Sequence, residues 1–232
     1  MITSWSHSRL VDFETCKYRA WLKYDQKIPE PERELPEGKT EHANDRGTRI
    51  HGLAEDFVRK GGKLPLELKK FETEFTQLRR LHGQGVVSLE GDWGLDPEWV
   101  PTEWRTAWGR SKLDAFVFID GHEAVAIDYK TGKKVGNELK HAEQLRLYAV
   151  IACSRYPQIE MIHTELWYLD VDDVTRQSMR RDQALRFKPG FHLRAEKLTT
   201  CTEFPPNPNK VSCKWCRYGP KFDGPCTVGV IV

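Results

Sequence analysis

The stretch that decides the fold is residues 113–132, LDAFVFIDGHEAVAIDYKTG. Two apolar runs stand on either side of Asp120 and Gly121, a pair that is typical of tight turns between antiparallel strands. A hairpin is therefore predicted at this point of the chain. Its two strands are expected at residues 113–119 and 124–129.

Each strand of this hairpin carries an aspartate. A loop at residues 120–122 places Asp114 directly opposite Asp128, with Cβ atoms roughly 5 Å apart on one face. Carboxylates that close repel each other unless a cation lies between them or one is protonated, and oxygen ligands favour Mg²⁺ or Mn²⁺ over zinc. Strand alternation puts Lys130 on this face and turns Tyr129 away from it. The lysine can then stabilise charge on a phosphate oxygen or orient a water, although the same sequence is compatible with an ordinary solvated strand end.

The remaining elements are predicted to surround the hairpin. Helical spacing of apolar residues predicts a helix over residues 8–22 with Ser8 as its N-cap. Gly61 and Gly62 are expected to end a second helix over residues 45–60. Further helices are predicted at 64–81, 138–154 and near Thr199, and further strands at 86–93, 104–108 and 164–169. This order predicts a mixed α/β (α+β) fold with a central sheet flanked by helices.

The composition is that of a folded domain rather than a disordered or membrane-spanning chain. The 232 residues are 39% hydrophobic and 30% charged, with 36 Lys and Arg against 34 Asp and Glu. This apolar content can form a core, and no apolar run approaches the roughly 20 residues that span a bilayer. Residues 1–8 lack the basic and apolar regions of a secretory signal. We therefore expect one soluble cytoplasmic domain over residues 1–232, with no membrane partner.

Two pairs of polar residues recur at i and i+4 on the predicted helices. His51 and Glu55 project from one face of the second helix. Gln144 and Tyr148 do the same on the helix that follows Lys130. An amide and a phenol at that place can position a phosphate or the lysine. Each pair taken alone is also compatible with an ordinary surface or core role.

Taken in chain order, these motifs resemble the PD-(D/E)XK nuclease superfamily, and within it the RecB-like exonucleases with AddB-type, CRISPR-associated and phage-encoded members. The resemblance implies a restriction-endonuclease-like fold, in which helices flank a central mixed sheet. At the second acidic position, where the family often has Glu, this chain has Asp128. The matching segments are Gly47-Thr48-Arg49-Ile50-His51 with Glu55, then Asp114, then Asp128-Tyr129-Lys130-Thr131-Gly132, then Gln144-Leu145-Arg146-Leu147-Tyr148.

The resemblance also implies a role for each motif residue. Lys130 is implied to be the catalytic lysine, acting beside the two aspartates. The metal, Mg²⁺ or Mn²⁺, is implied to be held by His51, Asp114, Asp128 and the backbone carbonyl of Tyr129. The Gln-x-x-x-Tyr element of the family is represented by Gln144 and Tyr148.

Three of the six cysteines lie close together near the C-terminus. Cys213 and Cys216 form a Cys-x₂-Cys knuckle, and Cys226 follows in a stretch rich in Pro and Gly. In a reducing compartment such cysteines indicate a metal site, and a closed site needs four thiolates. Cys16 resembles the N-terminal ligand of the iron–sulfur RecB-like nucleases. The resemblance therefore implies a [4Fe–4S] cluster that closes the N-terminal helix against a cysteine-rich segment at about 201–232.

Other interpretations of the cysteines stay open. Zinc can occupy the same four-thiolate site, or the knuckle can be empty. Cys201 is a rival fourth ligand, and the spacing from Cys216 to Cys226 is longer than the family usually shows. Cys153 is expected in the core.

The C-terminal part of the chain is basic. Residues 174–221 hold eleven Lys and Arg against three Asp and Glu, which indicates either a solvated face or a phosphate-binding one. Cations interleaved with aromatic rings fit a single-strand DNA channel, in which bases stack and phosphates pair with cations. Trp215 is also compatible with packing over the cluster. The residues predicted to bind DNA are Lys210, Lys214, Trp215, Arg217 and Tyr218.

Together these features predict a metal-dependent DNA exonuclease that hydrolyses phosphodiester bonds by in-line attack of an activated water. The expected setting is phage or bacterial DNA recombination or repair, in the host cytoplasm if the chain is phage-encoded. The chain lacks the Gly-x-x-x-x-Gly-Lys-Ser/Thr motif of ATP motors, so a helicase or annealing partner would be a separate protein. The alternatives are a structure-specific endonuclease on the same fold and a non-catalytic DNA-binding accessory protein.

Overall fold

The computed structural model describes residues 1–32, 34–132 and 134–231. It divides into two compact units. The first unit combines both ends of the chain with a short internal segment: Met1–Glu34, Trp108–Arg110 and Gly190–Val232. The second consists of Leu35–Ala107 and Ser111–Pro189. Within the described part of the chain, every helix is too short or too polar to cross a membrane.

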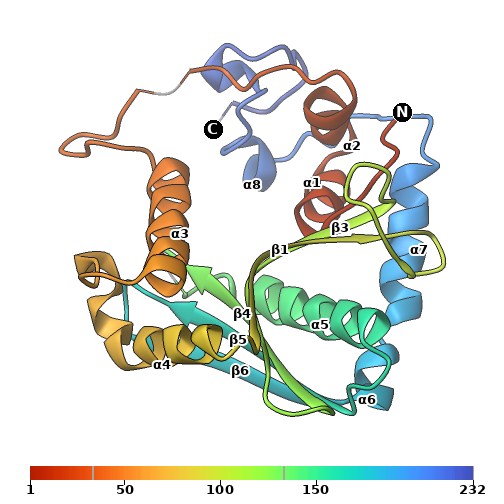
Figure 1. Cartoon of the computed structure of the whole chain (residues 1–232). Helices are drawn as coiled ribbons and strands as arrows, with labels where there is room; N and C mark the ends of the chain where they lie inside the picture. The colour runs from red at the N-terminus through yellow and green to blue at the C-terminus, as the bar shows by residue number, and fades with distance from the viewer. Residues whose placement is uncertain (33, 133, 232) are drawn as a thin grey trace. The chain divides into compact units, whose positions relative to one another are not determined.

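A six-stranded sheet with the order β2-β1-β3-β4-β5-β6 forms the centre of the second unit (Figure 1). The pairs β3–β4 and β5–β6 are antiparallel, whereas β4 and β5 are parallel. The parallel pair is connected through helix α5, as a crossover requires. The predicted mixed α/β class is therefore confirmed. The strands are β1 (Val87–Leu95), β2 (Pro101–Thr102), β3 (Gly109–Phe118), β4 (Glu123–Lys130), β5 (Met161–Tyr168) and β6 (Asp173–Arg180).

Helices cover both faces of this sheet. On one face α3 (Ala43–Lys60), η2 (Leu66–Phe71) and α4 (Glu72–Gly83) share one apolar core with the sheet. On the other face α5 (Glu138–Arg155) packs against β4 and β5, and the short α6 (Arg181–Leu185) follows β6. Helix α3 ends at Gly61, as predicted, where the backbone turns to a φ of 77°.

The hairpin of β3 and β4 has the predicted register. Backbone pairing runs from Phe118 opposite Ala124 to Ala115 opposite Ile127. The next position in this register places Asp114 opposite Asp128. Because side chains alternate along a strand, both aspartates project from the face that α5 covers, and Ala115 and Ile127 project into the core beneath α3 and α4.

Residues 104–108 and strand β6 differ from the prediction. Residues 104–108 form a turn rather than a strand, because the Thr106 N–H donates to the Glu103 carbonyl and closes the chain on itself. The aromatic residues there favoured a strand, but pairing with a neighbouring segment begins only at Trp108, whose carbonyl accepts from the Trp5 N–H at 2.8 Å. Strand β6 was not predicted, since its sequence DVTRQSMR is mostly polar and it lies at the edge of the sheet.

The first unit is built mainly from short helices. The predicted helix over residues 8–22 is interrupted at Cys16, whose backbone is extended with φ −161° and ψ 113°. The N-cap is Ser6 rather than Ser8, and its hydroxyl accepts from the Arg9 N–H. Apolar periodicity continues across the break, so periodicity alone predicts one continuous helix. The elements are α1 (His7–Thr15), α2 (Lys17–Ala20), the π-helical turn η1 (Trp21–Asp25), α7 (Lys188–Thr199), α8 (Lys210–Cys213) and η3 (Pro220–Phe222).

Candidate functional site

Asp114 lies at the point where backbone pairing between β3 and β4 ends. Its Oδ2 accepts a hydrogen bond from the Tyr129 N–H at 2.5 Å, and its Oδ1 lies 2.7 Å from Nδ1 of His51. Burial raises the pKa of Asp114, and the charge of Asp128 raises it further, while the His51 hydrogen bond opposes both. A carboxylate that is 8% exposed and adjoins a second one is poised to hold a cation.

His51 reaches this carboxylate from α3. Burial on its own lowers the pKa of His51, but the hydrogen bond and charge of Asp114, with the charge of Asp128, outweigh it and raise the pKa overall. The predicted i+4 neighbour Glu55 has a different partner, since it accepts a 2.6 Å hydrogen bond from Arg59. Of this helical pair, only His51 contacts the aspartate.

Asp128 is fixed by two residues of α5. The Tyr148 hydroxyl donates to Oδ1 at 2.5 Å, and the Gln144 amide donates to the same oxygen at 3.3 Å and to the Tyr148 oxygen at 2.5 Å. Burial and the adjacent aspartate raise the pKa of Tyr148 well above its usual value, so the phenol remains a donor. The predicted pair therefore lies together, and here it holds the aspartate rather than Lys130.

Lys130 lies beside the other oxygen of Asp128. Its Nζ is 2.6 Å from Oδ2, and the two groups form an ion pair. Within the described chain this buried oxygen has no hydrogen-bond partner besides the ion pair with Lys130. Such an oxygen is available to a metal ion.

The backbone and the side chain of Tyr129 contact different parts of the structure, and the side chain points away from the two aspartates, as strand alternation predicts. Its N–H serves Asp114, while its ring is buried on the opposite face against Phe75 and Trp167. The role of its carbonyl as a metal ligand stays a prediction.

Glu90 of β1 is the site residue that the sequence analysis missed. Glu90, His51 and Asp114 offer ligand atoms within 4.8 Å of one another, and in the described ranges this is the one such group of three or more. Burial raises the pKa of Glu90, and the charge of Asp114 adds to the effect. Its φ of 48° lies in the left-handed region, a strain that is common at functional sites. The available signal was Gly91, because a glycine inside a strand pattern indicates local distortion.

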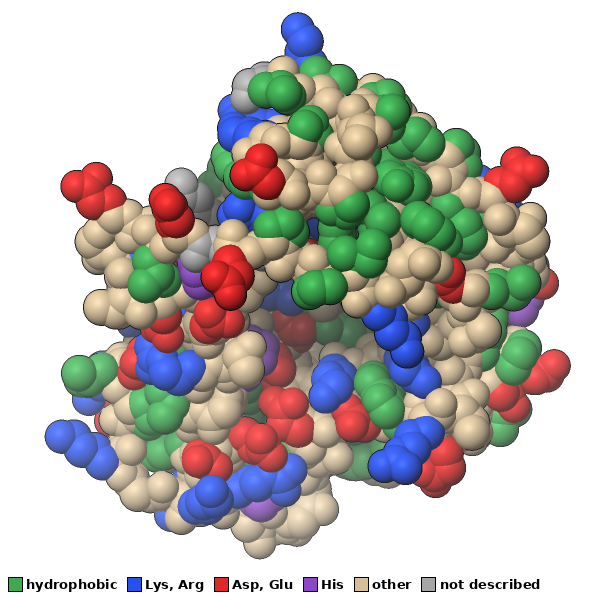
Figure 2. Space-filling view, turned by 90° about the horizontal axis from the view of Figure 1, so that it is seen from above, with side chains coloured by type: hydrophobic (Ala, Val, Ile, Leu, Met, Phe, Trp, Pro, Cys, Tyr) green, Lys and Arg blue, Asp and Glu red, His purple; other side chains and the backbone are tan. Residues whose placement is uncertain are grey.

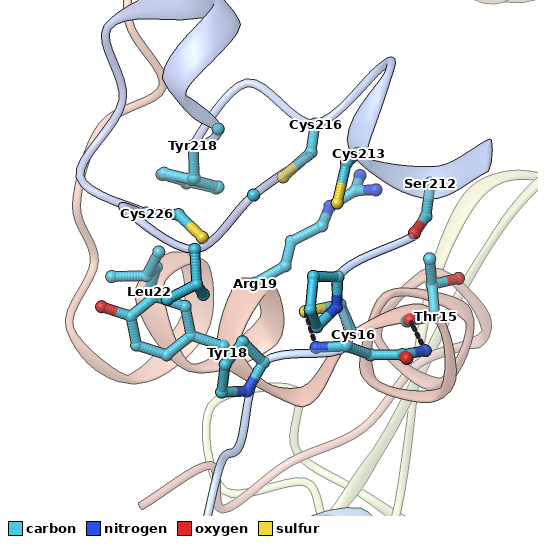
Figure 3. Close-up of a pocket in the computed structure, with 16 residues that line it drawn as sticks. Thr15, Cys16, Tyr18, Arg19, Leu22, Ser212, Cys213, Cys216, Tyr218 and Cys226 are labelled. Carbon is cyan, nitrogen blue, oxygen red and sulfur yellow. Dashed lines mark hydrogen bonds between the residues drawn. The ribbon is translucent and has the colours of Figure 1, made fainter. Parts of the chain in front are cut away.

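The four cysteines predicted to bind a cluster line one pocket of the first unit (Figure 3). They are Cys16, Cys213, Cys216 and Cys226. Backbone N–H groups of Asn207 and Asn209 donate to the sulfurs of Cys16 and Cys213, both at 3.4 Å. Burial is the main cause that raises the pKa of Cys216, and Cys16 and Cys226 raise it further.

The sulfurs in this pocket do not form a compact metal centre. All six cysteines are free thiols, and no three sulfurs of the described chain lie within 4.8 Å of one another. Cys201 is absent from the pocket lining, and its Sγ donates to the Glu203 carbonyl. Cys153 is buried in α5, as predicted.

The predicted DNA-binding residues are mostly accessible. Lys210, Lys214 and Trp215 are exposed, and the Lys214 Nζ lies 5.2 Å from the centre of the Trp215 ring. Trp215 is 72% exposed, so it does not pack inside the pocket. The Arg217 guanidinium stacks on Phe222 at 4.2 Å. On the face drawn in Figure 2, acidic and basic side chains are interspersed rather than separated by sign.

Tyr218 is placed differently from the prediction. Its side chain is 1% exposed, and its hydroxyl donates to the Ile28 carbonyl at 2.9 Å. A base cannot stack on a ring buried in this way, so Tyr218 packs the core of the first unit instead. An aromatic residue next to lysines does not reveal from sequence which way its ring points.

Comparison with known proteins connects this geometry to a family. The model of the PD-(D/E)XK nuclease superfamily matches residues 4–220. A Eubacterium rectale protein named "Putative exonuclease" has a similar structure, with 14% identity, a TM-score of 0.51 and coverage of 93% of this chain and 88% of that chain. The structure of SSO0001 has 13% identity, a TM-score of 0.47 and coverage of 94% and 84%. No curated protein matches the sequence.

The superfamily model covers nearly the whole chain. Asp114 and Asp128 occupy opposed positions where the pairing of β3 and β4 ends, but among the described residues Asp128 is outside the group of three potential ligands that His51, Glu90 and Asp114 form. The mixed sheet flanked by helices agrees with the restriction-endonuclease-like arrangement. The chain belongs to the PD-(D/E)XK nuclease superfamily.

Proposed function

We propose that this protein is a divalent-metal-dependent deoxyribonuclease that acts as an exonuclease of the RecB-like branch. The observation that carries the proposal is the pair of buried carboxylates, Asp114 and Asp128, with His51 on one and Lys130 on the other. Membership of a nuclease superfamily supports hydrolysis of phosphodiester bonds. The name of the E. rectale neighbour agrees with exonuclease action.

The residues present fit a hard divalent cation. Two buried carboxylates at opposed strand positions are costly without positive charge, and in the described residues the second oxygen of Asp128 has no partner besides the ion pair with Lys130. Oxygen ligands with one imidazole suit Mg²⁺ or Mn²⁺. When bound, the metal lowers the pKa of the attacking water and offsets charge on the phosphate. The proposed ligands are His51, Asp114, Asp128 and the carbonyl of Tyr129, with Glu90 adjoining them.

The other residues of the site prepare the reaction geometry. Tyr148 and Gln144 fix one oxygen of Asp128, so the second oxygen faces Lys130. The Lys130 ammonium stabilises the charge that develops on a phosphate oxygen or orients the attacking water. The protein thus supplies the Lys130 ammonium and the fixed Asp128 carboxylate to the scissile phosphodiester group.

The biological setting that we propose is phage or bacterial DNA recombination or repair in the cytoplasm, with the whole chain as one nuclease domain. The partner that we propose for ATP-driven unwinding is a helicase, since residues 1–232 hold no Gly-x-x-x-x-Gly-Lys-Ser/Thr motif. A separate annealing protein is the other partner that fits an exonuclease, because digestion exposes single strands.

The test is digestion of end-labelled single- and double-stranded linear DNA beside a closed circle, with Mg²⁺, Mn²⁺ or EDTA. Wild type is expected to degrade the linear DNA in a metal-dependent way and to leave the circle intact. Asp128→Ala and Lys130→Ala are expected to lose activity. Asp56→Ala, which removes an exposed carboxylate of α3 paired with Lys60, is the matched control and is expected to stay active.

Each other outcome has a definite meaning. Cleavage of the circle indicates an endonuclease on the same fold. DNA binding without digestion by anaerobically prepared protein indicates an accessory protein. Full activity of Lys130→Ala contradicts the role assigned to that lysine.

We also propose that the cysteine pocket of the first unit holds a [4Fe–4S] cluster with a structural role. The support is the set of four lining cysteines and the two N–H groups that donate to their sulfurs. Four thiolates on one zinc lie about 3.8 Å apart, given Zn–S bonds of about 2.3 Å. A four-iron cluster binds each thiolate on a different iron, so it suits sulfurs that are spread more widely.

Metal analysis of anaerobically purified protein tests the cluster. Iron and acid-labile sulfide with broad visible absorption are expected, and both are expected to be lost in Cys216→Ser. Cys201→Ser is the control that keeps them, because Cys201 does not line the pocket. Stoichiometric zinc, or no metal at all, contradicts the proposal.

Single-stranded DNA is proposed to contact residues near this pocket, namely the exposed Lys210, Lys214 and Trp215 and the partly buried Arg217. Base stacking on an exposed ring contributes about 1–3 kcal/mol, so Trp215→Ala is expected to weaken single-strand binding about tenfold or more. Val211→Ala, which trims a neighbour that is 82% exposed, is expected to bind as wild type does. Equal affinity of Trp215→Ala and wild type contradicts the stacking role.

A further inference from the structure

His141 lies on the face of α5 that is turned toward the candidate site. It stands in the first turn of the helix, three residues before Gln144 and seven before Tyr148, so the three side chains share a face. The other two both contact Asp128. None of the motifs in the sequence analysis includes this histidine.

Tyr168 anchors His141 beside the lysine. Tyr168 is the last residue of β5 and pairs in register with Lys130, so both side chains project from the same sheet face. The Tyr168 hydroxyl and Nδ1 of His141 form a 2.8 Å hydrogen bond, and the two ring centres are 5.6 Å apart. Because Tyr168 is 1% exposed, its hydroxyl is fixed and so is the imidazole that it holds.

The surroundings of the anchored imidazole favour its neutral form. Burial lowers the pKa of His141, and the charge of Lys130 lowers it further. When the Tyr168 hydroxyl donates to Nδ1, the single ring proton lies on Nε2. No side chain in the described ranges pairs with Nε2, and the residue is only partly buried.

We propose that His141 binds the DNA strand by donating a hydrogen bond from Nε2 to a phosphate oxygen beside Lys130. This inference rests on the proposed nuclease function and adds a substrate contact to it. A neutral donor contacts the phosphate without placing a second cation against the lysine. Since the contact exists before and during the reaction, it governs KM rather than kcat.

Two substitutions separate the two ring nitrogens. Gln places its amide near the position of Nε2, whereas Asn places its amide near that of Nδ1. His141→Asn is expected to raise KM and the Kd for DNA about tenfold, the loss that fits one hydrogen bond to a charged group, with kcat unchanged. His141→Gln is expected to recover most of the affinity. Tyr168→Phe, which frees the ring, is expected to raise KM by a smaller factor.

The measurements are steady-state digestion with Mg²⁺ and fluorescence anisotropy of labelled DNA with Ca²⁺. His163→Gln is the matched control, because His163 also bonds a hydroxyl through Nδ1, that of Ser178 at 2.7 Å, toward the other end of β5. It is expected to match wild type in KM and Kd. If His141→Asn does not fold, the KM of Tyr168→Phe decides the question.

The results distinguish this inference from the proposed function. Wild-type cleavage with unchanged KM in both His141 variants overturns the inference and leaves the nuclease proposal intact. Recovery by Asn but not by Gln assigns His141 a purely structural bond to Tyr168 and also overturns it. Wild-type protein that neither cuts nor binds DNA overturns the proposed function and this contact with it.

Discussion

The Tyr148 hydroxyl donates a 2.5 Å hydrogen bond to Oδ1 of Asp128 from the helix that covers the sheet. This bond fixes the carboxylate so that its other oxygen lies 2.6 Å from Nζ of Lys130. A metal ligand whose orientation is set by a neighbouring donor binds metal with less reorganisation. In the proposed site, where Asp128 is a metal ligand, the phenol acts on the chemistry through the aspartate.

Tyr148→Phe is therefore expected to lower activity about 10- to 100-fold, the usual effect of removing a partner of a metal ligand. The substitution keeps the ring that packs in α5 and removes only the donor. The loss is expected mainly in kcat and in metal affinity, measured by digestion assays over a Mg²⁺ titration. Tyr156→Phe, at the other end of the same helix, is the control. A Tyr148→Phe protein with wild-type metal dependence contradicts the positioning role.

Glu90→Gln is expected to weaken Mn²⁺ or Mg²⁺ binding about tenfold, because it removes one negative charge beside His51 and Asp114. The metal-free protein is expected to be as stable as wild type or slightly more so, since repulsion with Asp114 disappears. Calorimetric metal titration and thermal unfolding measure the two effects. Glu72→Gln, on the surface of α4, is the control. Unchanged metal affinity removes Glu90 from the proposed site.

The hairpin and its two aspartates could be predicted because their determinants are local. The Asp120–Gly121 turn sets the register, and the register brings Asp114 opposite Asp128. Glu90 could not be predicted in the same way. Its approach to Asp114 depends on the pairing of β1 with β3, which joins segments separated by a turn region with no clear strand pattern.

The sequence pattern also did not predict the burial of Tyr218 or the helix break at Cys16. Tyr218 stands among cations and prolines, but its ring is buried and its hydroxyl is bonded to Ile28. The break at Cys16 leaves apolar spacing intact on both sides, so periodicity does not reveal it. Both features depend on contacts between residues far apart in the chain.

Asp170→Asn is expected to reduce stability by about 0.5–1 kcal/mol at pH 7, the range for a well-formed but partly exposed pair. Asp170 accepts two hydrogen bonds from Arg46, at 2.9 and 2.7 Å, and this pair lowers the pKa of the carboxyl. The contribution is present above the unfolded-state pKa, about 4, and is lost as pH falls through the lower folded-state pKa.

Urea unfolding at pH 7 and pH 3 measures this dependence. The difference between wild type and Asp170→Asn is expected to shrink at pH 3, and also in high salt at pH 7 because salt screens the pair. Asp56→Asn, which removes an exposed pair with Lys60, is the control with a smaller effect at pH 7. A difference between wild type and Asp170→Asn that stays constant from pH 7 to pH 3 contradicts the assignment.

Thiol labelling is expected to divide the cysteines into three classes. Burial raises the pKa of Cys153 to about 11, and only the thiolate reacts, so Cys153 is expected to be labelled only after unfolding. Cys201 is partly exposed outside the pocket and is expected to react in the native protein. The pocket cysteines are expected to react only after metal is removed by chelation.

Peptide mapping by mass spectrometry after alkylation at pH 8 identifies each class. Labelling before and after chelation is compared because a protein without a cluster would expose Cys16, Cys213 and Cys216 from the start. All three are partly accessible. If these three react in fresh anaerobic protein as fast as Cys201 does, nothing protects them and the cluster proposal fails. If they react only after chelation, their thiolates were held by metal, since burial alone would protect them equally before and after its removal.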